Sequence, residues 1–367
     1  MYKLYFMPAK NLDIHFLKIA LALAKKGLNW TWPNPLVGAL IVKNGKVIGQ
    51  GYHHKFGGLH AEVNALRSAK SSVKGATLYV TLEPCSHWGK TPPCVEAIIN
   101  AGISRVVCCT KDSNPQVSGH GLQLLKKAGI AVMVGLLESE ARLLNEAFFT
   151  FHERKRPFVA LKFAASLDGK IATTTGDSQW ITNAAARGYA RSLRANYQAI
   201  LVGANTVLAD NPHLGLRQKK FSDPLRVILD GQLKTSPQAK VYRDSNVIVA
   251  TTASNPKKIV KFKQPGIETL VFPGQQVPLK RLLVVLAKRG VISILVEGGS
   301  QTLGAFLDER LVDKVYAFQA PILIGGKDSL SAFGGRGVKA IKQALKLERV
   351  NFKKFGDNTL TVGYVKP

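Results

Sequence analysis

The stretch that decides the fold of this chain lies between residues 60 and 94. It reads HAE at 60–62, ATLYVTLEPC at 76–85 and TPPC at 91–94. The middle block begins as a run of β-branched, aromatic and aliphatic residues, which is typical of a buried strand, and ends in glutamate, proline and cysteine. One histidine, one glutamate and two cysteines in this order predict a zinc site that can split water.

We expect His60, Cys85 and Cys94 to bind the metal, because imidazole and thiolate are ligands that Zn²⁺ prefers. Three protein ligands leave a fourth position for water, as in catalytic sites, whereas structural sites are usually closed by four. Glu62 stands two residues after the histidine and is expected to shuttle protons rather than to bind zinc. One histidine and two cysteines can also be ordinary core residues. The complete ordered set, with Glu62 and Pro84 in place, favours the metal site.

Zinc deaminases that act on nucleobases carry the pattern H-x-E followed by P-C-x-x-C. In this chain eight residues separate the two cysteines, and the longer block reads CSHWGKTPPC at 85–94. Together with PNPLVG at 33–38 and GYH at 51–53, this block resembles the deaminase half of the bifunctional riboflavin-biosynthesis deaminase/reductase family. The resemblance implies a cytidine-deaminase-like fold and hydrolytic deamination of a phosphoribosyl pyrimidine.

The resemblance also implies a set of residues around the pyrimidine and its phosphoribosyl tail. Lys90 is the expected phosphate partner because it lies on the loop between the two cysteines. His87 and Lys90 could equally be exposed loop residues without a role. The implied substrate-binding residues of the first half are Asn34, His53, His87, Lys90, Asp112 and Asn114.

Helix-like and strand-like segments alternate through the first half, which predicts an α/β fold. Asn44-Gly45 supplies the two positive φ angles of a type I′ turn, so the segments on either side of it should form a hairpin. We expect an N-terminal cytidine-deaminase-like three-layer domain over residues 11–152. Its predicted helices are 14–26, 60–70, 93–101, 122–128 and 138–149, and its predicted strands are 36–42, 46–48, 76–82, 105–110 and 130–134.

A charged segment that ends in Pro157 marks the predicted domain boundary, and a new apolar strand follows it at 158–163. The second half alternates again, which predicts a second α/β domain over residues 157–367. Its further predicted strands are 199–202, 225–229, 247–251, 269–272, 292–296, 314–318 and 360–364, and its predicted helices are 184–194, 279–289 and 303–309.

Many short blocks of the second half, among them SLDGKIA at 166–172, SQWIT at 178–182 and EGGS at 297–300, resemble the reductase half of the same family. The resemblance implies a dihydrofolate-reductase-like fold that uses NADPH. Gln198 departs from the family, where an acidic residue is expected, and we expect it to have a structural role. The implied cofactor-binding residues are Ala164, Trp180, Thr206, Asp210, Gly299, Ser300 and Gln301. The implied substrate-binding residues are Lys162, Ser178, Thr182, Arg194, Leu214, Arg217 and Glu297.

The formal net charge of +28 over 367 residues is the unusual property of the composition. Such a charge suggests nucleic-acid binding. The basic residues are scattered as short lysine pairs, so we favour a solvated lysine-rich surface and expect no nucleic-acid partner. Four cysteines and no run of eighteen apolar residues indicate a reducing, cytoplasmic setting without a membrane span. We expect a homo-oligomer, either a dimer or a tetramer.

Taken together, the resemblances of the two halves imply two consecutive steps of riboflavin biosynthesis. The first would deaminate 2,5-diamino-6-(ribosylamino)-4(3H)-pyrimidinone 5′-phosphate with one Zn²⁺ per chain. The second would reduce the ribosyl group with NADPH to give 5-amino-6-(5-phosphoribitylamino)uracil. Two alternatives stay open: a tRNA- or nucleoside-type deaminase with an appended domain, and a non-catalytic nucleic-acid-binding protein with a structural zinc.

Overall fold

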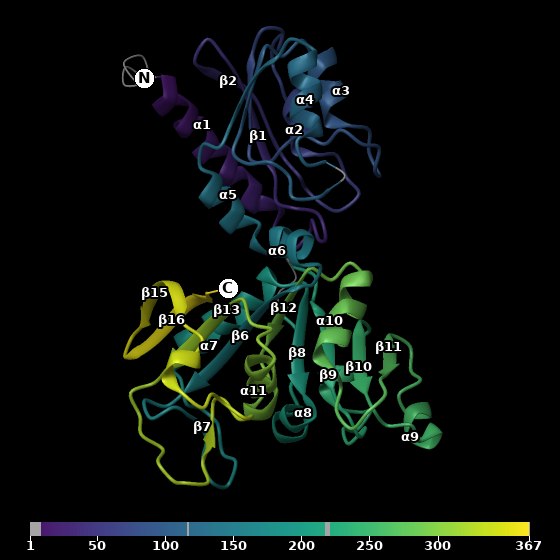
Figure 1. Ribbon diagram of the computed structural model, residues 1–367, viewed down its shortest axis with the longest axis vertical. Coiled ribbons are helices and arrows are strands. Elements are labelled where there is room, and N and C mark those ends of the chain that lie inside the picture. The colour runs from purple at the N-terminus through teal and green to yellow at the C-terminus, as the bar shows by residue number, and fades with distance from the viewer. Residues whose placement is uncertain (1–8, 116, 217–220, 367) are drawn as a thin grey trace. The chain divides into compact units, whose positions relative to one another are not determined.

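The computed structural model describes residues 9–115, 117–216 and 221–366. The chain divides into two compact units after Lys155, and each unit has its own sheet (Figure 1). Within the described residues, a helix with the length and apolarity needed to span a bilayer is not found.

The first unit is built on a five-stranded sheet in the order β2-β1-β3-β4-β5. The hairpin partner β2 and the neighbour β3 both pair with β1 in antiparallel fashion, whereas β3, β4 and β5 run parallel. The turn between β1 and β2 has positive φ angles at Asn44 (51°) and Gly45 (72°), as the type I′ prediction requires. The strands are β1 (Gly38–Lys43), β2 (Lys46–Tyr52), β3 (Thr77–Val80), β4 (Arg105–Cys108) and β5 (Ala131–Val134).

Helices cover both faces of this sheet and make three layers (Figure 1). On one face, α1 and α5 pack over Leu40, Tyr79 and Val107. On the other face, α2, α3 and α4 pack over Ile41 and Leu78. The alternation of strand side chains between the two cores is the expected period of two. The helices are α1 (Ala9–Ala24), α2 (Ala61–Arg67), α3 (Cys94–Asn100), α4 (His120–Lys127), α5 (Glu138–Leu144) and α6 (Glu146–Arg154), and a short 3₁₀ turn follows α1 at Lys25–Gly27.

The single helix predicted over 138–149 is wrong, because the chain breaks at Asn145 into α5 and α6. The buried Asn145 side chain accepts a hydrogen bond from Leu36 N (2.8 Å) and donates one to Leu36 O (2.9 Å). This pairing with a distant backbone segment satisfies polar groups that would otherwise be buried without partners. The helical periodicity on either side of Asn145 does not indicate this break between the two helices.

The second unit is built on a nine-stranded sheet in the order β11-β10-β9-β8-β12-β6-β13-β16-β15. The seven strands from β11 to β13 are parallel, and the last two pair antiparallel. A separate two-stranded sheet joins β7 and β14. The strands are β6 (Phe158–Ala165), β7 (Lys170–Ala172), β8 (Ala199–Gly203), β9 (Leu225–Leu229), β10 (Val247–Thr251), β11 (Ile267–Val271), β12 (Ser293–Val296), β13 (Lys314–Gln319), β14 (Leu330–Ser331), β15 (Leu347–Phe355) and β16 (Asn358–Val365).

The main core of the second unit lies between the sheet and two helices, α10 and α11, which contribute Leu282, Leu286 and Phe306. On the opposite face, α7 packs Tyr189 against Phe318 of β13. The helices are α7 (Ala184–Leu193), α8 (Ala204–Asp210), α9 (Pro256–Val260), α10 (Leu279–Lys288) and α11 (Ser300–Asp308), with 3₁₀ turns at Arg194–Asn196, Lys240–Tyr242 and Ile341–Gln343.

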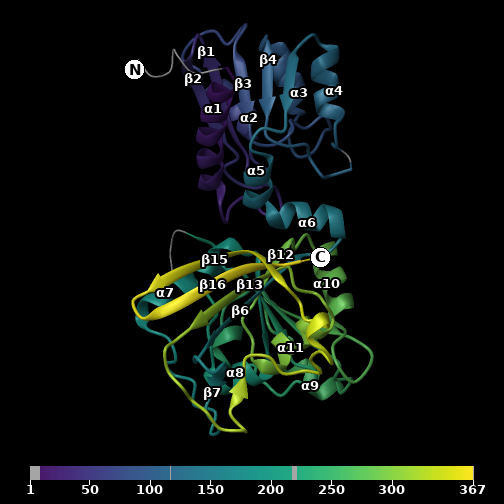
Figure 2. The ribbon, with the colours of Figure 1, turned by 60° about the vertical axis from the view of Figure 1, so that its left-hand side comes forward.

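The edge strand of this sheet, β15, is not among the strands predicted from the sequence (Figure 2). It is highly charged, and its pairing with β16 is irregular between Glu348 and Asn351, so the apolar alternation that identifies a strand is lost. Gln198 is the residue immediately before β8, and its side chain accepts a hydrogen bond from Ile292 N (3.0 Å), the residue before β12. This contact confirms the expected structural role of Gln198.

Candidate active sites

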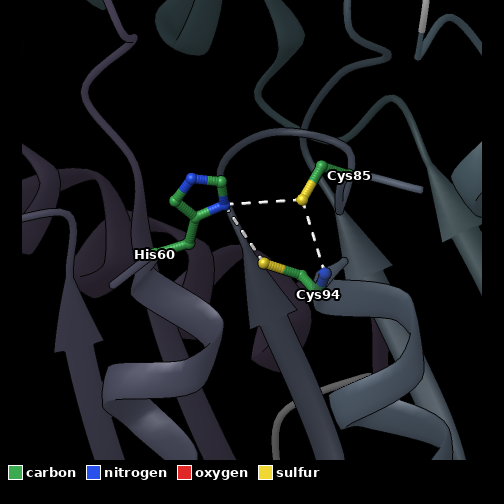
Figure 3. A group of neighbouring side chains, drawn as sticks. All are labelled: His60, Cys85 and Cys94. Carbon is green, nitrogen blue, oxygen red and sulfur yellow. Dashed lines mark hydrogen bonds between the residues drawn. The ribbon is translucent and has the colours of Figure 1, made fainter. Parts of the chain in front are cut away.

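Three elements of the first unit bring the expected metal ligands together (Figure 3). His60 is the residue immediately before α2, Cys85 follows β3, and Cys94 is the first residue of α3. The His60 Nδ1 atom lies 3.4 Å from Cys85 Sγ and 3.3 Å from Cys94 Sγ. The Cys94 backbone N–H donates to Cys85 Sγ (3.4 Å). The N-termini of α2 and α3 and the loop after β3 therefore place three donor atoms around one point.

This donor set fits a tetrahedral zinc ion. Zinc–sulfur and zinc–nitrogen bonds of about 2.3 and 2.0 Å put neighbouring ligand atoms about 3.5 Å apart, which is close to the separations observed here. The hydrogen bond with Cys94 lowers the pKa of Cys85, and His60 acts in the same direction against the effect of burial. The thiolate, which is the form that binds metals, is therefore favoured at Cys85.

Glu62 lies in the first turn of α2 and is 3 % exposed. Burial raises the pKa of Glu62 to about 7, although the nearby His60 opposes the shift. The carboxyl group also interacts with the Cys94 thiol. A carboxyl group whose pKa is near neutrality can both take up and release a proton.

Asn34 and His53 form a hydrogen-bonded pair beside the metal ligands. Asn34 Nδ2 lies 3.1 Å from His53 Nε2, and His53 Nδ1 lies 3.1 Å from Leu59 O. The rings of His53 and His60 are in edge contact, with centroids 5.3 Å apart. Burial lowers the pKa of His53, so its ring is neutral near pH 7. The structure thus brings His53 into contact with His60, one of the expected metal ligands, and Asn34 into contact with His53.

The other expected residues of the first half lie on two loops. Among the described residues, His87 Nδ1 is a buried atom without a hydrogen-bond partner, which suits a group that receives a ligand. Lys90 holds its ammonium group 4.1 Å from the centroid of the exposed Phe56 ring. Asp112 accepts a hydrogen bond from Asn114 N (2.7 Å). Burial raises the pKa of Asp112 to about 7, and the neighbouring charges of Glu83 and Cys85 add to the shift.

The second unit contains a pocket of ≈ 560 Å³ at the carboxyl ends of β6, β8, β9 and β12. Ligands of parallel α/β sheets commonly bind at this edge. Most of the residues that the sequence analysis proposed for NADPH and the second substrate line this one pocket: Lys162, Ala164, Ser178, Trp180, Thr182, Thr206, Asp210, Glu297, Gly299, Ser300 and Gln301.

Arg194 does not line the pocket directly but contacts Glu297, which does. Its guanidinium group also donates to Gly215 O (3.1 Å), which places the buried Leu214 next to this contact. Arg217 lies outside the described residues.

Two regions of the chain match families of known proteins. Residues 10–110 match the cytidine and deoxycytidylate deaminase zinc-binding region, and residues 157–361 match the RibD C-terminal domain. The riboflavin biosynthesis protein RibD of Aquifex aeolicus (strain VF5) is 46% identical over 352 residues, which are 95% of this chain and 97% of that protein. The chain belongs to the RibD family.

Solved structures of RibD proteins share the whole architecture. The deaminase/reductase of Thermotoga maritima superposes with a TM-score of 0.89 at 40% identity and covers 98% of this chain and 100% of its own. Acinetobacter baumannii RibD gives a TM-score of 0.89 at 36% identity, with the same coverage. The family and fold class predicted from the sequence are confirmed. The chain is a bifunctional deaminase and reductase of riboflavin biosynthesis, with zinc and NADPH as its cofactors.

One end of the reductase pocket of this RibD chain is formed by residues that were not predicted from the sequence. Asp230, Gly231, Gln232 and Lys234 line the pocket just beyond β9. Asp230 is buried and accepts hydrogen bonds from Lys234 N (2.8 Å) and Thr235 N (2.8 Å), which shapes the turn. The position of this turn could have been inferred from the sequence, because β9 was predicted and the carboxyl ends of parallel strands meet at one edge.

Proposed function

We propose that the first unit deaminates the phosphoribosyl diaminopyrimidine and that the second unit reduces the ribosyl group of the product. The observation that carries the first step is the convergence of His60, Cys85 and Cys94 beside the buried Glu62. The observation that supports the second step is a separate pocket lined by Lys162 and Glu297 in the other unit.

In the deaminase step, zinc held by His60, Cys85 and Cys94 would bring the pKa of water from about 16 towards 7. Glu62 accepts the proton of the attacking water on its carboxylate. It then delivers that proton to the ring nitrogen. In a second transfer it takes the proton of the hydroxyl group newly bound to the carbon and gives it to the amine, which leaves as ammonia. Burial, which raises the pKa of this carboxyl group, favours uptake of the proton, and the charge of a bound zinc ion would act in the opposite direction.

The residues around the metal ligands hold the substrate. Asn34 and the neutral His53 offer amide and imidazole groups to the pyrimidine edge. His87 offers its buried, unpartnered Nδ1, as judged among the described residues. Lys90, whose charge lies over the Phe56 ring, contacts the phosphate. Asp112 and Asn114 bind the ribosyl portion.

In the reductase step, NADPH supplies the hydride for C1′ of the ribose. The turns that follow β8 and β12 pack tightly together and line the pocket. A Cβ atom on Gly298 would lie 2.8 Å from Gly203 N, so only glycine fits there. Gly299 N donates to Thr206 Oγ1 (3.0 Å), which fixes the turn before α11. The start of α11 presents backbone N–H groups, and we assign it to the cofactor phosphates.

Lys234 is our candidate for selecting NADPH over NADH. It is exposed at the β9 end of the pocket, two strands away from the Gly298 turn in the sheet order. Neighbouring strands lie about 4.8 Å apart, so about 10 Å separate the two strand ends. A dinucleotide with its pyrophosphate at α11 can reach across this interval and place its 2′-phosphate near the Lys234 ammonium group.

The proposal is tested by incubating the full chain with the diaminopyrimidine phosphate, with and without NADPH, while ammonia and NADPH absorbance are followed separately. Ammonia release should not require NADPH, and NADPH consumption should follow ammonia release. The Cys85→Ser variant should release no ammonia, but it should still reduce an added deaminated intermediate. NADPH consumption without ammonia release would contradict the proposed order.

The charge of +28 is the observation that favours a polynucleotide substrate instead. Binding to a polynucleotide weakens steeply with salt, whereas binding of a small phosphorylated pyrimidine should weaken much less. Deamination of single-stranded RNA that falls sharply between low and physiological salt, together with no activity on the free pyrimidine, would support this alternative.

We also propose a cytoplasmic homo-oligomer, either a dimer or a tetramer. None of the four cysteines forms a disulfide, which suits a reducing compartment. The edge strand β15 carries a Phe352 side chain that is 77 % exposed, and the unpaired backbone groups of an edge strand can pair with another chain. Light scattering after size-exclusion chromatography of the full chain and of Phe352→Lys would test this: a monomeric wild type contradicts the proposal.

A further inference from the structure

Glu83 is a buried carboxylate that neither the metal site nor the substrate contacts proposed above use. It follows β3 and precedes Cys85 by two residues, and it is 3 % exposed. One carboxylate oxygen accepts hydrogen bonds from Asp112 N (3.2 Å) and Gly119 N (2.9 Å), and the other accepts one from Leu122 N (3.3 Å). One side chain therefore satisfies three backbone N–H groups of a segment that is distant in sequence.

The Glu83 backbone joins the same segment, because Glu83 N donates to Thr110 O (3.0 Å). The packing between the two segments leaves little room for adjustment. A Cβ atom on Gly121 would lie 2.1 Å from Pro84 O, so residue 121 can only be glycine at this separation. A backbone hydrogen bond, the hydrogen bonds of the Glu83 side chain and close packing thus hold the loop that carries Cys85 against the loop between β4 and α4.

The loop between β4 and α4 carries Asp112 and Asn114, which the proposed function assigns to the substrate. Asp112 Oδ1 accepts a hydrogen bond from Asn114 N (2.7 Å), which ties the two residues to each other. The Glu83 side chain holds this loop through the N–H groups of Asp112 and Gly119. A buried, fully hydrogen-bonded carboxylate between a ligand loop and a substrate loop is the kind of supporting contact that orients functional groups.

We propose that Glu83 is a positioning residue of the deaminase site, which sets Asp112 and Asn114 at the correct distance from the zinc ligands. This inference rests on the proposed role of those two residues. Glu83 acts on substrate binding through the loop and is not one of His60, Cys85 and Cys94, the group that could hold a metal ion.

The test uses the full-length chain and compares Glu83→Gln with Asp13→Asn. Glutamine has the same size but turns an NH₂ group towards backbone N–H donors. The variant weakens hydrogen bonds from backbone N–H groups to a charged side chain, which are stronger than those to a neutral one. KM for the diaminopyrimidine phosphate should therefore rise about tenfold or more. The kcat value should fall less, zinc should remain at one per chain, and reductase activity should not change.

Asp13→Asn is the matched control, because Asp13 is a buried carboxylate of the same unit that accepts two hydrogen bonds from Arg105 (2.8 and 2.7 Å) away from the zinc ligands. It should lower the melting temperature without changing KM. An equal rise of KM in both variants would show a general loss of stability and overturn the proposal. Loss of zinc from Glu83→Gln would also overturn it, because the residue would then support the metal.

A wild-type chain without deaminase activity would contradict the proposed function, whereas an active wild type with an unchanged KM in Glu83→Gln contradicts only the positioning role. Should Glu83→Gln be recovered unfolded by circular dichroism, Glu83→Asp decides in its place. It keeps the buried charge but is one methylene shorter, so the rise in KM should persist in a folded protein. An unchanged KM in Glu83→Asp would then overturn the proposal.

Discussion

Arg194 and Glu297 form a two-point ion pair at the reductase pocket, with Nε to Oε1 at 2.7 Å and Nη2 to Oε2 at 3.0 Å. Lys162 Nζ lies 3.9 Å from the same carboxylate. Burial acts to raise the pKa of Glu297, but Arg194 and Lys162 outweigh it and hold that pKa below its ordinary value. Two cations around one anion leave a positive charge, which suits a phosphorylated substrate.

Replacement of Arg194 by methionine should destabilise the second unit by about 3–5 kcal/mol, because it leaves a buried carboxylate with one distant cation. Reduction of the deaminated intermediate should also be lost, whereas ammonia release should continue. Urea unfolding followed by circular dichroism measures the first effect. Arg191→Met is the control, since Arg191 is exposed on α7, and it should change stability by less than about 0.5 kcal/mol.

Glu62→Gln and Cys85→Ser should separate proton transfer from metal binding. Glu62→Gln should keep about one zinc per chain and lose a factor of about 10²–10⁴ in kcat of deamination, the usual contribution of a general acid–base residue. Cys85→Ser should lose metal and deamination together. Metal analysis and ammonia assays on both variants check this. Full zinc content in Cys85→Ser, or near wild-type turnover in Glu62→Gln, would refute the corresponding assignment.

Lys234→Gln should weaken NADPH binding about tenfold or more, because a charge-assisted contact to a phosphate is lost. NADH binding should change little, since NADH lacks the 2′-phosphate. Equilibrium titration by tryptophan fluorescence measures both affinities without turnover. Lys280→Gln, an exposed lysine of α10, is the matched control. If Lys234→Gln weakened the binding of NADPH and NADH equally, Lys234 would not contact the 2′-phosphate.

Asp13 should make the first unit sensitive to acid. Burial acts to raise the pKa of Asp13, but hydrogen bonds from Arg105 and Tyr79 outweigh it and lower the pKa. A depressed pKa in the folded state stabilises the fold above the unfolded value of about 3.9 and loses that contribution as the pH falls through the folded value. The free energy of unfolding of Asp13→Asn should therefore fall less steeply below about pH 4 than that of the wild type. The free energies of unfolding of both proteins are measured by urea titration at several pH values. If they change with pH in the same way, the assignment is contradicted.

The second unit should fold and bind NADPH by itself, because the core cluster found among the described residues is built from residues of that unit. The fragment should begin at Arg156 and not at Pro157. Arg156 makes two hydrogen bonds with Asp313 (2.6 and 2.8 Å), and Asp313 also accepts one from Val159 N (2.8 Å). Circular dichroism and NADPH titration of residues 156–367 and 157–367 test this, and the shorter fragment should be less stable. A folded longer fragment without NADPH affinity would contradict the reductase assignment.

The order of motifs and the local periodicity could be predicted from the sequence because they depend on neighbouring residues. The zinc ligands, Glu62, the Asn44-Gly45 hairpin and most strands follow from residue type and spacing. The break at Asn145 and the edge strand β15 could not be predicted. The first depends on a pairing with Leu36 across the fold, and the second depends on pairing with β16 rather than on an apolar pattern.

For the sites, the sequence by itself determined which residues can bind zinc and transfer protons, since those properties belong to the side chains. Only the tertiary structure decided which groups meet. The Glu83 carboxylate reaches backbone N–H groups 29 to 39 residues away, and Lys234 shares a pocket with Glu297 because β9 and β12 end at the same edge of the sheet. Such contacts arise from the pairing and twist of distant strands, which local sequence patterns do not specify.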